Sequence, residues 1–183
     1  MRDGAETWVE AALATLAEGG IERVCVEVVA ERLGVTKGGF YRRFKDRRAL
    51  LDAMLETWSA GRIAVIHQQT ALDGLTPRQR LKALVKLYTE RISAQGMAIE
   101  LAIRQWARAD PSAAAAAARV DAARLAAVAE LYRRLGLSAE DAQGRAILFY
   151  AFIFGQSLLF LAQAPRKRAS LLAACADALT DIT

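Results

Sequence analysis

Apolar residues recur along the chain at the three- and four-residue spacing of amphipathic helices. No stretch alternates apolar and polar residues long enough to indicate a strand, and residues 24–29 form the one β-branched cluster. The pattern therefore predicts an all-α protein of about nine helices. The stripe nearest the amino terminus consists of Val9, Ala12, Leu13 and Leu16.

Capping residues and prolines mark the expected helix starts. Thr76-Pro77 and Asp110-Pro111 each combine a capping side chain with a proline at the first helical position. Ser138 and Asp141 have the spacing of a capping box. In the N-terminal part we expect, in order, a helix ended by Gly19-Gly20, a short helix over 26–33, a helix over 37–44 that Thr36 caps, and a long helix that Asp46 caps and that runs to about Gln69.

Composition narrows the class of protein. The chain has 183 residues, 54% of them hydrophobic and 25% charged, whereas a disordered chain combines low apolar content with high net charge. Its one histidine excludes a site built from several histidine ligands, and we expect no metal and no cofactor. Cys25 and Cys175 form no CxxC motif and are expected to be small buried residues in a reducing compartment. The first residues lack the apolar run of a signal peptide, so we expect a cytoplasmic protein.

Positive charge is concentrated in one short segment. Residues 36–48 carry six basic side chains against one acidic one, although the whole chain has a net charge of only +5. Such a run is usually a solvated basic face. Here it contains the second helix of a pair in which Ala30 would let the helices cross closely and Gly34 would let the chain turn sharply. The basic residues are Lys37, Arg42, Arg43, Lys45, Arg47 and Arg48.

The second helix of this pair has the properties of a helix that reads DNA. Residues 36–39 at its start are polar or small, so that side chains and backbone could reach base edges. Its two glycines cost about 1 kcal/mol each relative to alanine, a cost that close approach to another molecule would explain. Arg42, Arg43 and Lys45 lie where they could hold phosphates, and Arg47 with the amides of the next helix offers a seat for an anion. We therefore favour DNA binding over a solvated face.

Residues 5–55, here called the head, resemble the DNA-binding part of the tetracycline-repressor (TetR) family of bacterial regulators. The matching segments are LGVTKGGFYRRFKDRRALL and, before it, AALATLAEGGIERV. The resemblance implies a helix-turn-helix DNA-binding domain over residues 1–48 and a larger helical ligand-binding and dimerisation domain over residues 49–183. It also implies a homodimer, for which two-fold symmetry predicts a palindromic operator.

The resemblance further implies roles for single residues. Tyr41 would place its hydroxyl on a phosphate, Arg42 would reach the groove or the backbone, and Arg47 would grip the backbone from the following helix. Two positions depart from the family: Val24-Cys25-Val26 stands where a Thr or Ser usually caps the second helix, and Gly39 stands where a larger side chain is common. The residues expected at the DNA are Thr36, Lys37, Gly38, Gly39, Tyr41, Arg42, Arg43, Lys45 and Arg47.

Residues 146–162 contain no charged side chain. The run is slightly short of the ~20 residues of a membrane span, and Gly155-Gln156-Ser157 interrupts it. A helix that is apolar all round can instead be buried on both sides. We therefore expect no membrane segment but a helix that packs on the core with one face and on a second copy of the chain with the other. Together with the last helix it would form the homodimer interface.

The resemblance and the long fourth helix suggest a mechanism. A small apolar ligand would tilt that helix, change the separation of the two heads and release a repressor from its operator. A transcriptional activator or a ligand-independent regulator of the same fold is the alternative. An enzyme is not expected, because HExxH, GxSxG and phosphate-loop motifs are missing, and a purely protein-binding module would not explain the cations. The expected ligand-pocket residues are Trp58, Tyr88, Ile103, Trp106 and Phe152.

Overall fold

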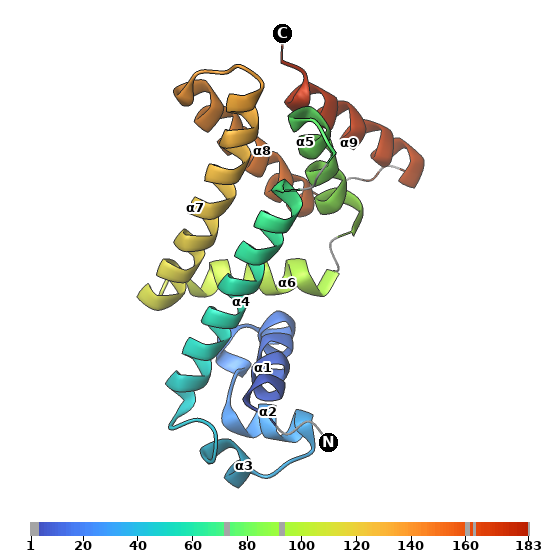
Figure 1. The fold of residues 1–183 in the computed structure, drawn as a ribbon. Helices are drawn as coiled ribbons and strands as arrows, with labels where there is room; N and C mark the ends of the chain where they lie inside the picture. The colour runs from blue at the N-terminus through green and yellow to red at the C-terminus, as the bar shows by residue number, and fades with distance from the viewer. Residues whose placement is uncertain (1–3, 72–73, 92–93, 160–161, 163, 183) are drawn as a thin grey trace. The chain divides into compact units, whose positions relative to one another are not determined.

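The computed structural model describes residues 4–71, 74–91, 94–159, 162 and 164–182, and the secondary structure of this part is helical throughout (Figure 1). It contains nine α-helices and no strand, as the periodicity predicts. A short 3-10 segment, η1, and a short π-helical segment, η2, accompany them. The elements are α1 (Ala5–Gly19), η1 (Ile21–Arg23), α2 (Val26–Leu33), α3 (Lys37–Tyr41), α4 (Arg47–Thr70), α5 (Pro77–Lys86), η2 (Leu87–Arg91), α6 (Ala94–Trp106), α7 (Pro111–Arg134), α8 (Ala139–Leu158) and α9 (Pro165–Thr180).

The chain divides into two compact units. Unit 1 comprises residues 1–62 and 93–120, and unit 2 comprises residues 63–92 and 121–183. The long helices α4 and α7 therefore each contribute to both units. The head lies entirely within unit 1.

The core of unit 1 is built around α1, which packs against α2 and α6. Trp8 and Leu16 of α1 are completely buried, as expected for the apolar face of this helix. The Trp8 ring meets the ring of Phe40 edge-on at a centroid distance of 5.4 Å, and Phe40 stacks on Phe44 at the same distance. These rings attach the short helix α3 to the rest of the head.

The core of unit 2 gathers side chains from α5, η2, α7 and α8. Leu81, Tyr88, Phe149 and Ile153 belong to one buried cluster. Tyr132 of α7 donates a hydrogen bond from its hydroxyl to the Leu179 carbonyl of α9 at 2.9 Å. Burial raises the pKa of Tyr132 to about 12, so the phenol stays protonated and remains a donor.

Most of the predicted caps are confirmed. Asp46 accepts from the Ala49 N–H at 2.9 Å, and Asp110 accepts from the Ser112 N–H at 2.8 Å. Thr76 forms a complete capping box with Gln79. At α8 only half of the expected box forms: Ser138 Oγ accepts from the Asp141 N–H, while the Asp141 carboxylate accepts from the Ser138 hydroxyl.

Two details of α3 differ from the prediction. Thr36 occupies the N-cap position but makes no side-chain capping bond, because the Gly39 N–H donates to the Thr36 carbonyl at 2.9 Å instead. The helix also ends at Tyr41 rather than at residue 44. The Arg43 and Phe44 N–H groups both donate to the Phe40 carbonyl, which tightens the last turn and lets the Phe44 ring enter the core.

The cysteines are less buried than predicted: Cys25 is half-buried and Cys175 is exposed on α9. Cys175 lies on α9, whose outward side is accessible over most of its length. None of the helices described meets the length and apolarity that crossing a membrane requires. In the same part of the chain, no three His, Cys, Asp or Glu side chains gather in a way that would hold a metal ion.

Candidate nucleic-acid interface

The turn between α2 and α3 depends on Gly34. Its φ of 66° is left-handed, a conformation that glycine adopts without steric cost. The Val35 N–H donates to the Ala30 carbonyl and the Gly34 N–H to the Glu31 carbonyl, both at 3.0 Å, which is the Schellman pattern of a helix end. Ala30 is buried, as expected for the residue at which α2 and α3 cross. The sequence prediction of a tight helix-turn-helix is therefore confirmed.

The two glycines of α3 lie in different surroundings. Gly39 is buried, and a Cβ placed on it would lie 3.8 Å from the Trp8 ring. Gly38 is exposed, and its nearest neighbour would be the Thr36 hydroxyl at 3.7 Å. The expectation that both glycines bring backbone close to DNA therefore fits the placement of Gly38 but not that of Gly39, which faces the head's own core.

The exposed side of α3 carries Lys37, Gly38 and Tyr41. Tyr41 is 63% exposed, an unusual position for a large aromatic side chain, and its ring meets Phe40 edge-on at 5.1 Å. Phe40 is completely buried, so the outward orientation of the Tyr41 phenol is fixed by a neighbour anchored in the core. An aromatic ring with a hydroxyl at its tip is well suited to donate to a phosphate oxygen.

Lys37 forms an ion pair with Glu27 of α2, with Nζ 2.7 Å from Oε1. Both side chains are well exposed, so the pair contributes little to stability and exchanges readily for another anion. The hydrogen bond from Lys37 lowers the pKa of Glu27, so this carboxylate is charged at neutral pH. Glu27 therefore holds Lys37 on the same surface as Tyr41 in the absence of DNA.

Some of the basic side chains after α3 are exposed to solvent, and others are hydrogen-bonded to the protein itself. Arg42 and Lys45 are exposed, as expected for groups that could meet phosphates, and Thr36 is exposed beside them. Arg43 is half-buried and donates from Nη1 to the Gly39 carbonyl at 2.9 Å. This bond satisfies a carbonyl near the C-terminal end of α3, where a positive charge is favourable.

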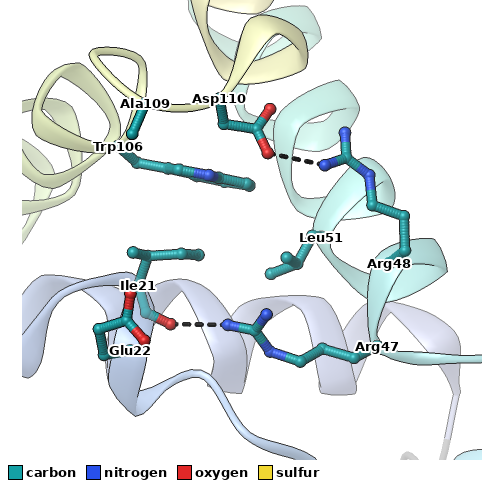
Figure 2. A pocket seen from close by; sticks show the side chains of 8 residues that line it. All are labelled: Ile21, Glu22, Arg47, Arg48, Leu51, Trp106, Ala109 and Asp110. Carbon is teal, nitrogen blue, oxygen red and sulfur yellow. Dashed lines mark hydrogen bonds and ion pairs between the residues drawn. The ribbon is translucent and has the colours of Figure 1, made fainter.

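Arg47, expected to hold DNA, lies at the start of α4 and bonds to the head itself. Its Nε donates to the Val24 carbonyl at 2.6 Å and its Nη2 to the Ile21 carbonyl at 2.9 Å; the second bond is drawn in Figure 2. Cys25, at the N-cap of α2, makes no capping bond and donates instead from Sγ to the Glu22 carbonyl. The chain entering α2 is thus fixed by Arg47.

Sequence reasoning assigned no specific role to Arg48, which has one partner close in sequence and one that is distant. Its Nη1 donates to Asp110 Oδ2 at 2.7 Å and its Nε to Asp52 Oδ1 at 2.8 Å. Desolvation alone would raise the pKa of Asp110, but hydrogen bonds from the Ala113 N–H, Arg48 and the Ser112 N–H together hold it below its usual value. Asp110 was recognised from its cap-plus-proline signal, which carries no information about an arginine in the head.

A pocket of about 310 Å³ lies beside this ion pair within unit 1. In Figure 2 the Trp106 ring faces Ile21 and Leu51 across it. Of the five predicted ligand-pocket residues, Trp106 lines this cavity, Trp58 and Ile103 are buried elsewhere in unit 1, and Tyr88 and Phe152 belong to unit 2. The lining consists of Ile21, Glu22, Arg47, Arg48, Leu51, Trp106, Ala109 and Asp110.

The sequence resembles known transcription regulators. The family model described as "Bacterial regulatory proteins, tetR family" matches residues 9–54, from α1 into the first part of α4. The chain is 35% identical over 106 residues to the HTH-type transcriptional repressor KstR of Mycolicibacterium smegmatis, a match that covers 58% of this chain and 52% of that repressor. It is 43% identical over 54 residues to the class A tetracycline repressor protein of transposon 1721 from Escherichia coli, covering 30% of this chain and 25% of that protein.

The fold is also found among solved structures. A transcriptional regulator from Rhodococcus sp. Rha1 superposes with a TM-score of 0.76 at 21% sequence identity, covering 96% of this chain and 93% of that one. At this identity the likeness concerns the fold. The matched region spans about half the length of the KstR relative.

Proposed function

Because the chain belongs to the TetR family of bacterial regulatory proteins, we propose that it is a transcriptional repressor that binds a palindromic DNA operator as a homodimer. A small hydrophobic ligand releases it from this operator. The relatives and the fold are those of regulators and not of enzymes. A protein that binds chromosomal DNA acts in the cytoplasm of a bacterium.

The observation that carries this proposal is the exposed side of α3. A strongly exposed Tyr41 lies on the same short helix as Lys37, and the inner side of that helix is fixed by the completely buried Phe40. In a helix-turn-helix, the N-terminal end of the second helix meets base edges, so Lys37 and Gly38 approach the major groove. Tyr41, Arg42 and Lys45 meet phosphates, and Thr36 contributes a hydroxyl at the same end. Arg43 and Arg47 act by holding the backbone that presents these groups.

The homodimer uses the exposed apolar faces of α8 and α9. Ile147 and Leu148 of α8 are more than half exposed, as are Leu158 and Leu159 at its end, and Leu171 extends the apolar surface on α9. Large exposed apolar side chains gathered on neighbouring helices favour burial against a partner. A second copy of the same two helices supplies a matching apolar surface, since a two-fold interface is self-complementary.

Release by a ligand requires that the ligand bind the DNA-incompetent arrangement more tightly than the competent one. The pocket residues predicted from the sequence, Trp58, Tyr88, Ile103, Trp106 and Phe152, remain candidates for contacts with it. Repression is favoured over activation because the KstR and tetracycline-repressor relatives are both named repressors. An activator or a ligand-independent regulator would have the same head and the same DNA contacts.

The test is selection of bound duplexes from a random DNA pool, followed by sequencing. We expect a palindrome whose half-sites are separated by a whole number of helical turns, because two heads related by a two-fold axis read symmetric half-sites. A bound sequence without two-fold symmetry would refute the proposal that a homodimer binds the operator. If the protein bound duplexes of every sequence equally at every salt concentration, the proposal of a specific operator would be refuted.

A further inference from the structure

The pocket of unit 1 has two apolar walls that face each other. Figure 2 shows the Trp106 ring on one side of the pocket and the side chains of Ile21 and Leu51 on the other. Trp106 is 5% exposed and Leu51 is 4% exposed, so both walls are held firmly in the packed part of unit 1. A space bounded by an indole ring and by aliphatic side chains favours a flat apolar molecule, because aromatic rings stack well on one another.

The volume of the pocket limits the size of such a molecule. At about 310 Å³ it lies at the lower end of the range of small-molecule sites, which runs from about 300 to 1,000 Å³. All of its lining residues belong to unit 1, so the site lies within one compact body. A compact aromatic compound with a short polar substituent would fill it.

The cation that such a substituent can reach is Arg47. Its neighbour Arg48 is already engaged by two carboxylates. Arg47 instead donates from Nε and Nη2 to two uncharged backbone carbonyls. Among the residues that the structure describes, it has no ion-pair partner, and its Nη1 makes no hydrogen bond. In Figure 2 the guanidinium lies at the edge of the pocket, on the side of Ile21 and Leu51.

Two acidic side chains of the lining limit the charge that the molecule can carry. Asp110 is paired with Arg48, whereas Glu22 is exposed and has no ion pair in the described part of the chain. These two carboxylates balance the two arginines of the lining. A singly charged carboxylate can accept from Arg47 Nη1 in a charge-assisted bond. A doubly charged phosphate would be repelled more strongly by Glu22.

We propose that this pocket binds a flat aromatic carboxylate, whose ring lies between Trp106 and the wall of Ile21 and Leu51 and whose carboxylate accepts a hydrogen bond from Arg47 Nη1. Arg47 keeps both of its bonds to the head, because these use Nε and Nη2. The bound molecule contacts the head on one side and the end of α6 on the other, so it ties these two segments of unit 1 together. The inference does not rest on the proposed release by a ligand, since a ligand-independent regulator would have the same pocket.

The test compares four probes on the full-length protein: indole-3-acetate, indole-3-acetamide, tryptamine and octanoate. The first three share a ring and differ in charge, and octanoate has the carboxylate without the ring. By titration calorimetry at low salt we expect the acid to bind about threefold to fivefold more tightly than the amide, the gain from an ion pair with an exposed arginine. Tryptamine should bind more weakly than the amide. Hydrogen exchange should show protection by indole-3-acetate, and none by octanoate, in peptides that cover residues 20–25 and 106–113.

Substitutions test each wall and the charge of the lining. Trp106→Leu should weaken indole-3-acetate binding about fivefold to tenfold, because the stacking surface is lost. Ala109→Phe narrows the pocket while it leaves Trp106 in place, and it covers the case in which Trp106→Leu does not fold. Glu22→Gln should strengthen acid binding about twofold, because it removes a repelling charge. Glu10→Gln, an exposed position of α1 outside the lining, removes the same charge and should leave binding unchanged.

Four results would overturn the inference. The first is no binding of indole-3-acetate at millimolar concentration, and the second is binding of the amide or of tryptamine as tight as that of the acid. The third is unchanged binding in whichever of the Trp106→Leu and Ala109→Phe variants folds. The fourth is an equal effect of the Glu22 and Glu10 substitutions, which would place the carboxylate away from this pocket. Binding of the probes is measured without DNA, so none of these results bears on the proposed operator.

Discussion

Arg48 at the start of α4 and Asp110 at the start of α7 form an ion pair with Nη1 2.7 Å from Oδ2, across 62 residues of sequence. The neighbouring Arg47 holds the carbonyls of Ile21 and Val24. Consecutive arginines in the first turn of α4 thus bind two different segments of unit 1, as Figure 2 shows. One segment leads into α2 of the head, and the other begins α7.

Asp110→Asn should lower the free energy of unfolding by about 1 kcal/mol, because it removes the charge that pairs with Arg48 and retains an oxygen that can cap α7. The pKa of Asp110 is lowered in the folded protein, so its ionised form contributes stability above the unfolded pKa, near 4, and loses it as the pH falls through the folded value. The difference between wild type and variant should therefore shrink below about pH 4. Urea unfolding at several pH values measures it, and Asp52→Asn, at the more exposed partner of Arg48, is the control.

Arg47→Ala should destabilise the head and weaken binding to all DNA sequences, because two backbone carbonyls lose their donor. A contact to phosphate would additionally reduce the slope of log affinity against log salt by about 1 per subunit. From the bonds that Arg47 makes we expect the slope to stay unchanged. Titrations at four salt concentrations separate these cases, and a slope that falls by one would make Arg47 a direct phosphate contact, as the family resemblance implies.

Lys37→Ala should cost about 1–3 kcal/mol on the preferred operator and relax specificity at one base position, since Lys37 lies at the end of α3 that meets the groove. Tyr41→Phe should weaken all sequences about equally, because a phosphate contact carries no sequence information. Glu27→Gln is the matched control: it frees Lys37 from its ion pair and should leave affinity equal or higher. Gel-shift titration on the operator and on a scrambled duplex measures both the affinity and the specificity of each variant. If Lys37→Ala lost the same affinity on both duplexes, Lys37 would not take part in base readout.

Leu148→Glu on α8 should convert the dimer to monomer, because a charge would be buried at the centre of the proposed interface. Sedimentation velocity measures the mass, and operator affinity should fall steeply, while the helical circular dichroism stays unchanged. Gln143→Glu, an exposed position on the same helix, adds the same charge nearer the start of α8. A Leu148→Glu protein that remains dimeric would place the interface elsewhere.

The features that the sequence predicted well are those that neighbouring residues determine. The α2–α3 turn follows from Gly34 alone, and the caps at Asp46 and Thr76 follow from side chains within three residues of the amides they bind. The family resemblance, carried by the head, was also confirmed. Features that depend on distant partners were missed. Neither the bond of Arg47 to the Val24 carbonyl nor the pair of Arg48 with Asp110 leaves a periodic signal in the chain.

The glycines of α3 show the same limit. From sequence both look like sites of close approach, yet which side of a five-residue helix faces the core depends on the position of Trp8, on another helix. Cys175 was predicted to be buried because cysteine usually is, but it lies on the exposed side of α9. A second copy of the chain packed on that side would bury it, and a single sequence carries no direct record of such a partner.

Gly38→Ala and Gly39→Ala form a matched pair that tests which side of α3 approaches DNA. Neither glycine has a positive φ, and an added Cβ meets nothing closer than 3.7 Å at position 38 or 3.8 Å at position 39. Each substitution should therefore stabilise the head by about 0.5–1 kcal/mol, the usual gain from alanine in a helix. Their effects on DNA should differ: the Cβ at 39 points at Trp8 and should leave affinity unchanged, whereas the Cβ at 38 lies on the exposed side and should weaken binding. Thermal unfolding and operator titration of both variants decide this, with Gly34→Ala, strained at φ 66°, as a destabilised reference. Equal affinities for the Gly38 and Gly39 variants would mean that the exposed side of α3 does not approach DNA closely.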